Sequence, residues 1–165
     1  MMPAGGSRDS WLFDDDDRSF MAIALGEARD TGRAGEVPVG AVIVADGREI
    51  ARAGNLREHA ADPTGHAEIR VLRAAALRSG DWRLPGHTLY VTLEPCPMCV
   101  AACRQARIDL LVWGAADPRI GACGTVLDLA EDARLGPPLA HRGGLGAQTS
   151  EELLRSFFEK RRRTS

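Results

Sequence analysis

Two short patterns in the chain carry side chains that can bind a metal ion. The first is His66-Ala67-Glu68, and the second runs from Pro95 through Cys96 to Cys99. Each pattern alone is common, since His-x-Glu often marks a polar helix surface and Cys-x-x-Cys also occurs in redox sites and structural zinc sites. Together they supply one imidazole and two thiols, a ligand set that suits zinc, and one carboxylate. The conjunction therefore predicts a zinc site with an acid beside it.

The spacing within each pattern indicates where the ion would lie. Cys96 and Cys99 are three residues apart at the start of a predicted helix, so both sulfurs can reach one ion, and the positive helix end favours their thiolates. His66 begins the other predicted helix and can supply the third ligand. Glu68 follows it by two positions, so the two side chains leave a helix in nearly opposite directions. We therefore expect the ion over the helix end, not on its flank.

Three protein ligands leave the fourth tetrahedral position for water, an arrangement typical of catalytic zinc, which lowers the pKa of that water to about 7. Glu68 is not needed as a ligand. It can take a proton from the water, pass it to a ring nitrogen and later protonate a leaving amine. This is the chemistry of zinc-dependent nucleobase deaminases, whose His-x-Glu and Pro-Cys-x-x-Cys signature the chain carries.

The segments that must position these residues are predicted from apolar periodicity and turn residues. In chain order they are a helix after the acidic run 14–17, a hairpin of strands 37–44 and 48–51 that turns at Asp46-Gly47, a helix at 65–78, a strand at 88–93, a helix at 96–107 opened by Pro95, a strand at 108–113 and a helix at 150–163. Residues 114–146 are rich in glycine and proline and stay unassigned apart from an apolar patch at 126–129. The order predicts an α/β sheet covered by helices.

The composition bounds the class of protein. The chain has 165 residues, 44% of them hydrophobic and 27% charged, which predicts one globular domain, assigned to residues 16–165. The N-terminus is small, polar and contains glycine, and residues 1–15 are predicted to form a flexible tail. A formal net charge of −2 gives no global attraction to nucleic acid, so any RNA contact needs a local basic patch. We expect a cytoplasmic protein with no membrane partner, because no segment has the pattern of a signal peptide or the length of a membrane span. In that compartment the cysteines are expected to bind metal and not to form disulfides.

Beyond the two patterns, longer stretches resemble the cytidine and deoxycytidylate deaminase superfamily, most closely its bacterial tRNA-specific adenosine deaminases. The similar stretches are EVPVGAVIV (36–44), DPTGHAEI (62–69), TLYVTLEPCPMC (88–99), ARI (106–108), GAADPRIGACGT (114–125) and LLRSFFEKRR (153–162). They occur in the family's order from about residue 20 to the C-terminus. Together they are far more specific than either motif alone.

The resemblance implies a fold, a substrate and a set of site residues. The implied fold has three layers, α/β/α, around a central five-stranded mixed sheet, and it usually forms a homodimer. The implied reaction is hydrolysis of adenosine to inosine at the wobble position of a tRNA anticodon stem-loop. The implied site residues are His66, Cys96 and Cys99 as ligands of one Zn2+ per subunit, Glu68 as the proton shuttle, Asn55 as a hydrogen-bond partner of the base, the backbone around Ala67, Pro38 and Val39 as pocket lining, and Asp117 near the RNA backbone.

The chain also departs from the family pattern. Gly65 stands where alanine is common, and Ala140-His141-Arg142 followed by two glycines replaces an Asn-His-Arg motif that leads into an alternating strand. These departures leave open a small-molecule deaminase of the guanine or cytosine type. A non-catalytic zinc module that binds RNA is a further alternative, although it predicts loss of Glu68 or Asn55, and both are present.

Several other residues have an ordinary structural interpretation as well as a functional one. Phe157 and Phe158 fit core packing better than base stacking, although the family resemblance leaves base stacking open for one of them. Cys103 and Cys123 are expected to be packed in the core. The basic run at 160–163 can contact RNA or complement the dipole of its helix.

Overall fold

Short apolar segments pair into one five-stranded sheet in the computed structural model of the chain, which describes residues 12–164. The strands are β1 (Gly40–Ala45), β2 (Arg48–Gly54), β3 (His87–Leu93), β4 (Leu110–Ala115) and β5 (His141–Gly143). Their order is β2-β1-β3-β4-β5, with antiparallel pairing of β1 to β2 and β3 and parallel pairing of β3 to β4 and of β4 to β5. The prediction of a five-stranded mixed sheet is confirmed.

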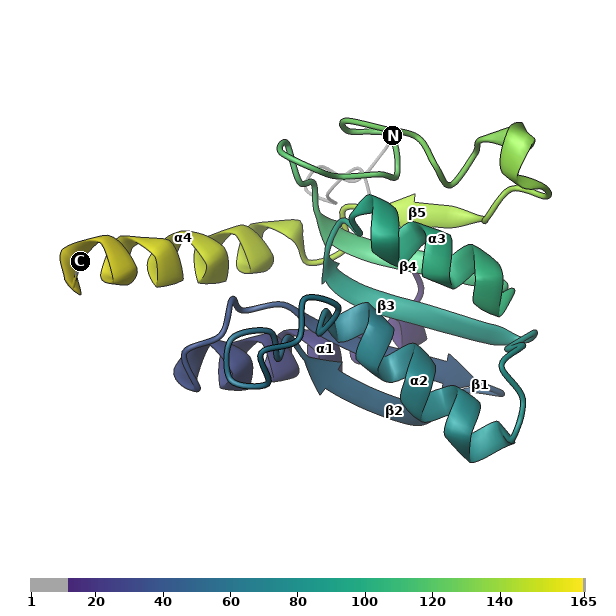
Figure 1. The fold of residues 1–165 in the computed structure, drawn as a ribbon, viewed down its shortest axis with the longest axis horizontal. Coiled ribbons are helices and arrows are strands. Elements are labelled where there is room, and N and C mark those ends of the chain that lie inside the picture. Colours follow the sequence, from purple (N-terminus) through teal and green to yellow (C-terminus); the bar gives the residue numbers. More distant parts are fainter. Residues whose placement is uncertain (1–11, 165) are drawn as a thin grey trace, which may run out of the picture.

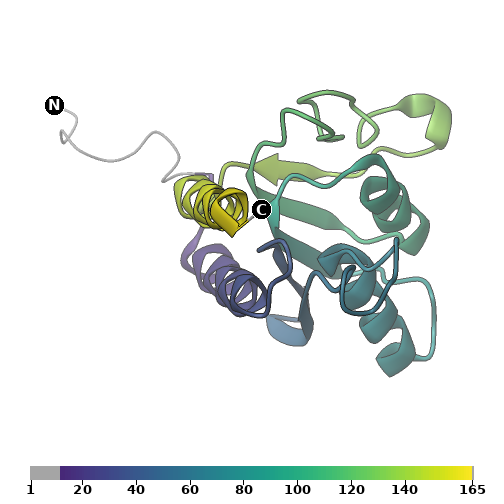
Figure 2. The same ribbon diagram turned by 60° about the vertical axis from the view of Figure 1, so that its left-hand side comes forward.

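Helices cover both faces of the sheet, as Figures 1 and 2 show. One face carries α1 (Asp15–Arg33) and α4 (Ala147–Thr164), and the other carries α2 (Ala67–Ser79) and α3 (Pro97–Ala106). Alternation along β1 separates two cores: Val42 and Val44 pack with α1, while Ala41 and Ile43 pack with α2 and α3. The three-layer α/β/α architecture follows from this two-sided burial.

The β1–β2 hairpin closes as its turn residues predict. Asp46 and Gly47 have φ angles of 51° and 68°, the left-handed conformation that a two-residue turn of this kind needs. The last strand is less regular. β5 lies inside the glycine-rich region that the sequence leaves unassigned, and a Cβ at Gly143 would overlap the ring of Trp113 on β4. Glycine at this position therefore lets the indole lie across the sheet edge.

Several predicted boundaries differ from the structure. β1 begins at Gly40 and not at residue 37, and β2 extends to Gly54 and not to residue 51. Pro97, not Pro95, occupies the first turn of α3, and Cys96 is the N-cap residue. β4 begins at Leu110 and not at residue 108, and α4 begins at Ala147, three residues before the expected start. These shifts lie at element ends, where local patterns constrain the chain least.

The N-terminal segment joins the domain earlier than the expected tail allows. Asp14 caps α1 in a capping box with Asp17, and Phe13 is 4% exposed in the core beneath α1. Residues 1–11 of the expected tail lie outside the described residues. Within residues 12–164, no helix combines the length and the apolar character that crossing a membrane requires.

Candidate active site

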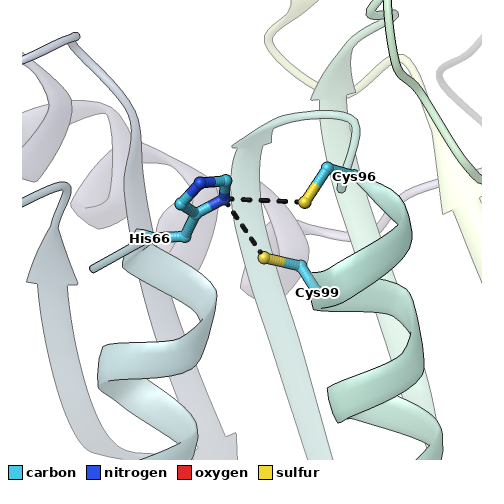
Figure 3. A group of neighbouring side chains, drawn as sticks. All are labelled: His66, Cys96 and Cys99. Atoms are coloured by element: carbon cyan, nitrogen blue, oxygen red, sulfur yellow. Dashed lines mark hydrogen bonds between the residues drawn. The ribbon is translucent and has the colours of Figure 1, made fainter. Parts of the chain in front are cut away.

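The N-terminal ends of α2 and α3 meet beside each other and bring three possible metal ligands together. His66 is the N-cap residue of α2, Cys96 is the N-cap residue of α3, and Cys99 lies in the first turn of α3. Nδ1 of His66 lies 3.6 Å from Sγ of Cys96 and 3.4 Å from Sγ of Cys99 (Figure 3). The expectation that an ion would lie over the helix end agrees with this placement, because an N-cap side chain points beyond the helix.

The donor atoms fit a single zinc ion. All three lie within 4.8 Å of one another. Tetrahedral zinc with a Zn–S distance of about 2.3 Å and a Zn–N distance of about 2.0–2.1 Å separates its nitrogen and sulfur ligands by about 3.6 Å. The measured separations of 3.4 and 3.6 Å match that value. Neither N-cap side chain forms a capping hydrogen bond, so both are available to an ion.

The electrostatics of the three donors suit a cation. Hydrogen bonds from the Cys99 thiol and from the imidazole of His66 lower the pKa of Cys96 to about 4, against the opposing effect of its burial. The same bond with Cys96, together with burial, raises the pKa of Cys99 far above its ordinary value. A zinc ion bound by both sulfurs would favour the thiolate form of each.

Glu68 lies beside the donors without belonging to their set. Its side chain is buried at 4% exposure, and burial is the main cause that raises its pKa to about 7. Its carboxyl group interacts with the Cys99 thiol. A carboxyl group that titrates near neutral pH suits transfer of protons in both directions.

A cavity of 140 Å3 opens in front of these groups. Of the residues predicted from the sequence, Val39, Asn55, His66, Glu68, Cys96 and Asp117 line it. Pro38 does not. It is buried next to Gly32 of α1, and its neighbours Val37 and Val39 face the cavity instead, since successive residues of an extended chain point to opposite sides.

Ala67 contributes to the site through its backbone. Its buried N–H group donates a 2.9 Å hydrogen bond to Oδ1 of Asn55. Because an N–H group can only donate, this bond fixes the orientation of the Asn55 amide. The NH2 group of Asn55 therefore remains available to a ligand, and it can donate a hydrogen bond to an acceptor on that ligand.

Asp117 is held in place by its own neighbours. Its N–H group donates a 3.0 Å hydrogen bond to the buried carboxylate of Glu94, and its Oδ1 accepts a 3.0 Å bond from the backbone of Arg119. Asp117 is 6% exposed, and its carboxylate lies 3.9 Å from the guanidinium of Arg119. It forms part of the cavity wall on the β4 side.

The structure adds lining residues that the sequence analysis missed, namely Val37, Arg57, Leu93, Glu94, Arg119, Ile120 and Phe158. Phe158 is half-buried on α4 and lines the cavity, so the expectation of simple core packing was incomplete. Cys103 and Cys123, by contrast, are buried as expected, at 0% and 5% exposure. All of them except Arg57 lie in the stretches that resemble the family. No local pattern shows which side chains in these stretches face the cavity, because only the fold brings the segments together.

A larger groove of 720 Å3 continues from the cavity toward α4. Val37, Leu93, Asp117, Arg119 and Phe158 line both spaces. The groove extends along the part of α4 that projects beyond the sheet in Figure 1, where Arg161 and Arg162 line it. A small cavity for one chemical group thus opens into a basic groove.

The sequence of the chain is similar to those of known proteins. Residues 14–115 match the family described as the cytidine and deoxycytidylate deaminase zinc-binding region. The tRNA-specific adenosine deaminase of Agrobacterium fabrum is 47% identical over 148 residues, 87% of this chain and 94% of that protein. The corresponding protein of Bacillus subtilis is 42% identical over 89% of this chain and 91% of its own.

Solved structures agree in fold. A chain from studies of A-to-I editing by tRNA:A34 deaminases at the wobble position of transfer RNA superposes with a TM-score of 0.80 at 47% identity, and the match covers 82% of this chain and 99% of that one. The guanine deaminase of Bacillus subtilis superposes with a TM-score of 0.59 at 36% identity, over 63% of this chain and 66% of its own.

Proposed function

Because the chain belongs to the cytidine and deoxycytidylate deaminase family, we propose that it hydrolyses adenosine to inosine at the wobble position of a tRNA anticodon. The observation that carries the proposal is the cavity in which Glu68 lies beside the His66, Cys96 and Cys99 donors. Relatives named tRNA-specific adenosine deaminases, similar over most of their length, support the choice of substrate.

His66, Cys96 and Cys99 would hold the zinc ion. Bound there, the ion supplies Lewis acidity that lowers the pKa of a water molecule to about 7. Glu68 accepts the proton of the attacking water and delivers it to the ring nitrogen next to the amine-bearing carbon. It then moves the remaining proton of the added hydroxyl group to the leaving amine, so that adenosine and water yield inosine and ammonia.

The remaining lining residues would orient the base. The NH2 group of Asn55 donates to an acceptor on the ring edge, because its carbonyl oxygen is occupied by Ala67. Val37, Val39 and Leu93 provide apolar walls for the faces of the base. Burial of the site keeps bulk water away from the reacting carbon and strengthens the electrostatic interactions inside.

The relative sizes of the two spaces favour a polymer over a free base. The 140 Å3 cavity is far smaller than the roughly 300–1,000 Å3 typical of pockets for drug-sized ligands, so it suits one base turned out of its stack. The ribose and neighbouring nucleotides would lie outside, in the basic 720 Å3 groove. A deaminase of free guanine or cytosine has no need of such a groove.

We also propose that the protein acts in the cytoplasm as a homodimer. Ile120, Val126 and Leu127 are 49%, 50% and 48% exposed on the segment after β4. Apolar side chains gathered on one exposed segment are typical of a surface that a second subunit covers. The homodimer that the family resemblance implies would cover them.

The test compares substrates and one variant. Zinc-loaded protein is incubated with an anticodon stem-loop that carries adenosine at the wobble position and, separately, with guanine and cytosine; inosine and released ammonia are measured. We expect inosine from the stem-loop, whereas turnover of the free bases alone would refute the proposed substrate. Glu68→Ala should keep one zinc per chain and lose activity by at least about a hundredfold. Normal turnover by the zinc-loaded variant would rule out the proton shuttle.

A further inference from the structure

The charged residues that line the cavity divide by sign and by exposure. The acidic ones, Glu68, Glu94 and Asp117, are 4%, 2% and 6% exposed. The cationic ones, Arg57 and Arg119, are exposed. A ligand that approaches the mouth of the cavity therefore meets positive charge first, although the chain as a whole carries a net charge of −2.

Arg57 stands on a segment that a buried carboxylate holds in place. Glu36, 2% exposed, accepts hydrogen bonds from the backbone N–H groups of Arg57, Glu58 and His59 at 3.1, 3.3 and 2.9 Å. The ring Nδ1 of His59 adds a fourth contact at 2.9 Å. The backbone under Arg57 is thus fixed, and its side chain is presented to the cavity from a rigid base.

The guanidinium of Arg57 has no hydrogen bond or ion pair among the residues that the structure describes, residues 12–164. An exposed arginine that lines a catalytic cavity and has no protein partner can offer its hydrogen-bond donors to a ligand.

Arg119 reaches the same cavity from another part of the fold. Its segment follows β4, whereas the segment of Arg57 follows β2, and two strands, β1 and β3, separate them in the sheet. Arg119 also lines the groove toward α4, and Arg57 does not. The two cations therefore lie at different sides of the mouth. Arg119 is next to the groove toward α4, whereas Arg57 lies away from it.

We propose that Arg57 binds a backbone phosphate adjacent to the nucleotide whose base enters the cavity, on the side away from the α4 groove. This inference rests on the proposed function, since it assumes a polynucleotide substrate. A guanidinium matches the geometry of a phosphate and can bind it with two hydrogen bonds. The contact carries no sequence information. Together with the groove toward α4 on the other side, it would hold the strand on both sides of the base.

The test measures binding, so that it does not depend on turnover. Arg57→Gln and the control Arg48→Gln are each made in the zinc-loaded Glu68→Ala protein, and the Kd for the wobble-adenosine stem-loop is measured by fluorescence anisotropy. Arg48 is exposed at the far end of β2, about 20 Å from Gly54 at a rise of about 3.4 Å per residue. Both substitutions remove one positive charge, so only position distinguishes them.

We expect Arg57→Gln to raise the Kd about tenfold and Arg48→Gln to change it less than about twofold. The slope of log Kd against log salt should fall by about 0.7 for Arg57→Gln, the value for one phosphate contact on a single strand. A neutral methylphosphonate in place of the contacted phosphate, on one side of the wobble adenosine, should raise the Kd of the Glu68→Ala protein that keeps Arg57 by the same factor. Arg57→Gln should then cause no further loss with that RNA.

Equal Kd values for Arg57→Gln and Arg48→Gln would overturn the proposal. The proposal would also be overturned if Arg57→Gln still raised the Kd about tenfold with both methylphosphonate RNAs, one neutralised at each phosphate that flanks the wobble adenosine. Failure of the proposed function is a separate result, because it would be seen as absence of inosine from the stem-loop with the wild-type enzyme. Preserved zinc content and melting temperature would show that Arg57→Gln is folded, as expected for a side chain without a structural bond.

Discussion

Glu94 offers a sharp test of how the cavity wall is built. This buried carboxylate, one residue before Pro95 and two before Cys96, accepts hydrogen bonds from the N–H groups of Asp117, Cys123 and Thr125 at 3.0, 2.9 and 3.2 Å, and another from the Thr125 hydroxyl. A Cβ at Gly121 would overlap the carboxylate, so the segment is closed tightly around it. Glu94 therefore links the start of the ligand helix to the segment that carries Asp117.

Glu94→Gln keeps the shape of the side chain and replaces one acceptor oxygen with an NH2 group. If the amide oxygen takes the place of Oε1, it still accepts from Cys123 and Thr125. The NH2 group then faces the N–H of Asp117, which is left without an acceptor, whereas the Thr125 hydroxyl can rotate and accept. One buried unsatisfied N–H costs about 1–3 kcal/mol, and loss of the charge weakens the other bonds, so we expect a total of about 3 kcal/mol.

A loss of about 3 kcal/mol corresponds to a melting temperature lower by roughly 6–12 °C for a domain of this size. Melting is followed by circular dichroism on zinc-loaded protein, with zinc content and the KM for the stem-loop measured on the same samples at a temperature where each is folded. We expect one zinc per chain and a raised KM, because the displaced segment forms the cavity wall and contains no zinc ligand. Glu151→Gln makes the same chemical change on an exposed residue of α4 and should shift melting by less than about 2 °C.

Thr125→Val tests the hydrogen bond from the Thr125 hydroxyl to Glu94 separately from the bonds donated by backbone N–H groups. It removes one donor to Glu94 and should cost about 1 kcal/mol. Glu94→Gln with a wild-type melting temperature and KM would refute the argument, since an unsatisfied buried N–H group cannot be without cost. Loss of zinc by Glu94→Gln while the protein stays folded would also refute it, by showing that Glu94 supports the ligands and not the wall.

Three further outcomes are expected. Cys99→Ala should lower bound zinc from one per chain to near zero, measured by atomic absorption; zinc retained at full stoichiometry would exclude Cys99 as a ligand. Gly65→Ala should cost about 1–3 kcal/mol, because its Cβ would overlap the backbone carbonyl of Leu56, whereas Gly26→Ala has open space in α1 and should gain up to about 1 kcal/mol; equal melting temperatures would contradict the packing argument. Burial of Glu36 disfavours its charge, but hydrogen bonds from residues 57–59 outweigh this and lower its pKa to about 2, so its stabilisation is complete above an unfolded pKa of about 4.5 and is lost as pH falls toward 2. Urea unfolding between pH 6 and pH 2.5 should show this loss, on the order of 2–3 kcal/mol, and Glu36→Gln should lack it; identical pH profiles would contradict the assignment.

Much of the chemistry follows from local spacing. His66, Cys96 and Cys99 are predicted as ligands and Glu68 as the nearby acid because two short patterns together supply the residue types of a catalytic zinc site, each at the start of a predicted helix. The structure brings the three donor atoms within 4.8 Å of one another, as that reasoning requires. The helices that hold them also begin near the predicted residues, because N-cap and proline preferences act over a few positions.

The walls of the cavity could not be predicted in the same way. The stretch Val37-Pro38-Val39 has no signal to say which of its residues line the cavity. The resemblance implied the backbone around Pro38 and Val39, and the structure places Val37 and Val39 in the lining. Arg57 and Phe158 are 101 positions apart in the chain and line one cavity. Such neighbours depend on how α4 packs against the sheet.

By itself, the order of amino acids determined which groups can bind an ion and move a proton, because these properties belong to residue types found together in two short patterns. Only the fold brought the two patterns together, since His66 and Cys96 are 30 positions apart. Only the tertiary structure decided what surrounds them: the small cavity, the carboxylates of Glu36 and Glu94 that hold its two flanking segments, and the groove beyond it. Contacts between distant segments result from the packing of all layers together, and no short pattern encodes them.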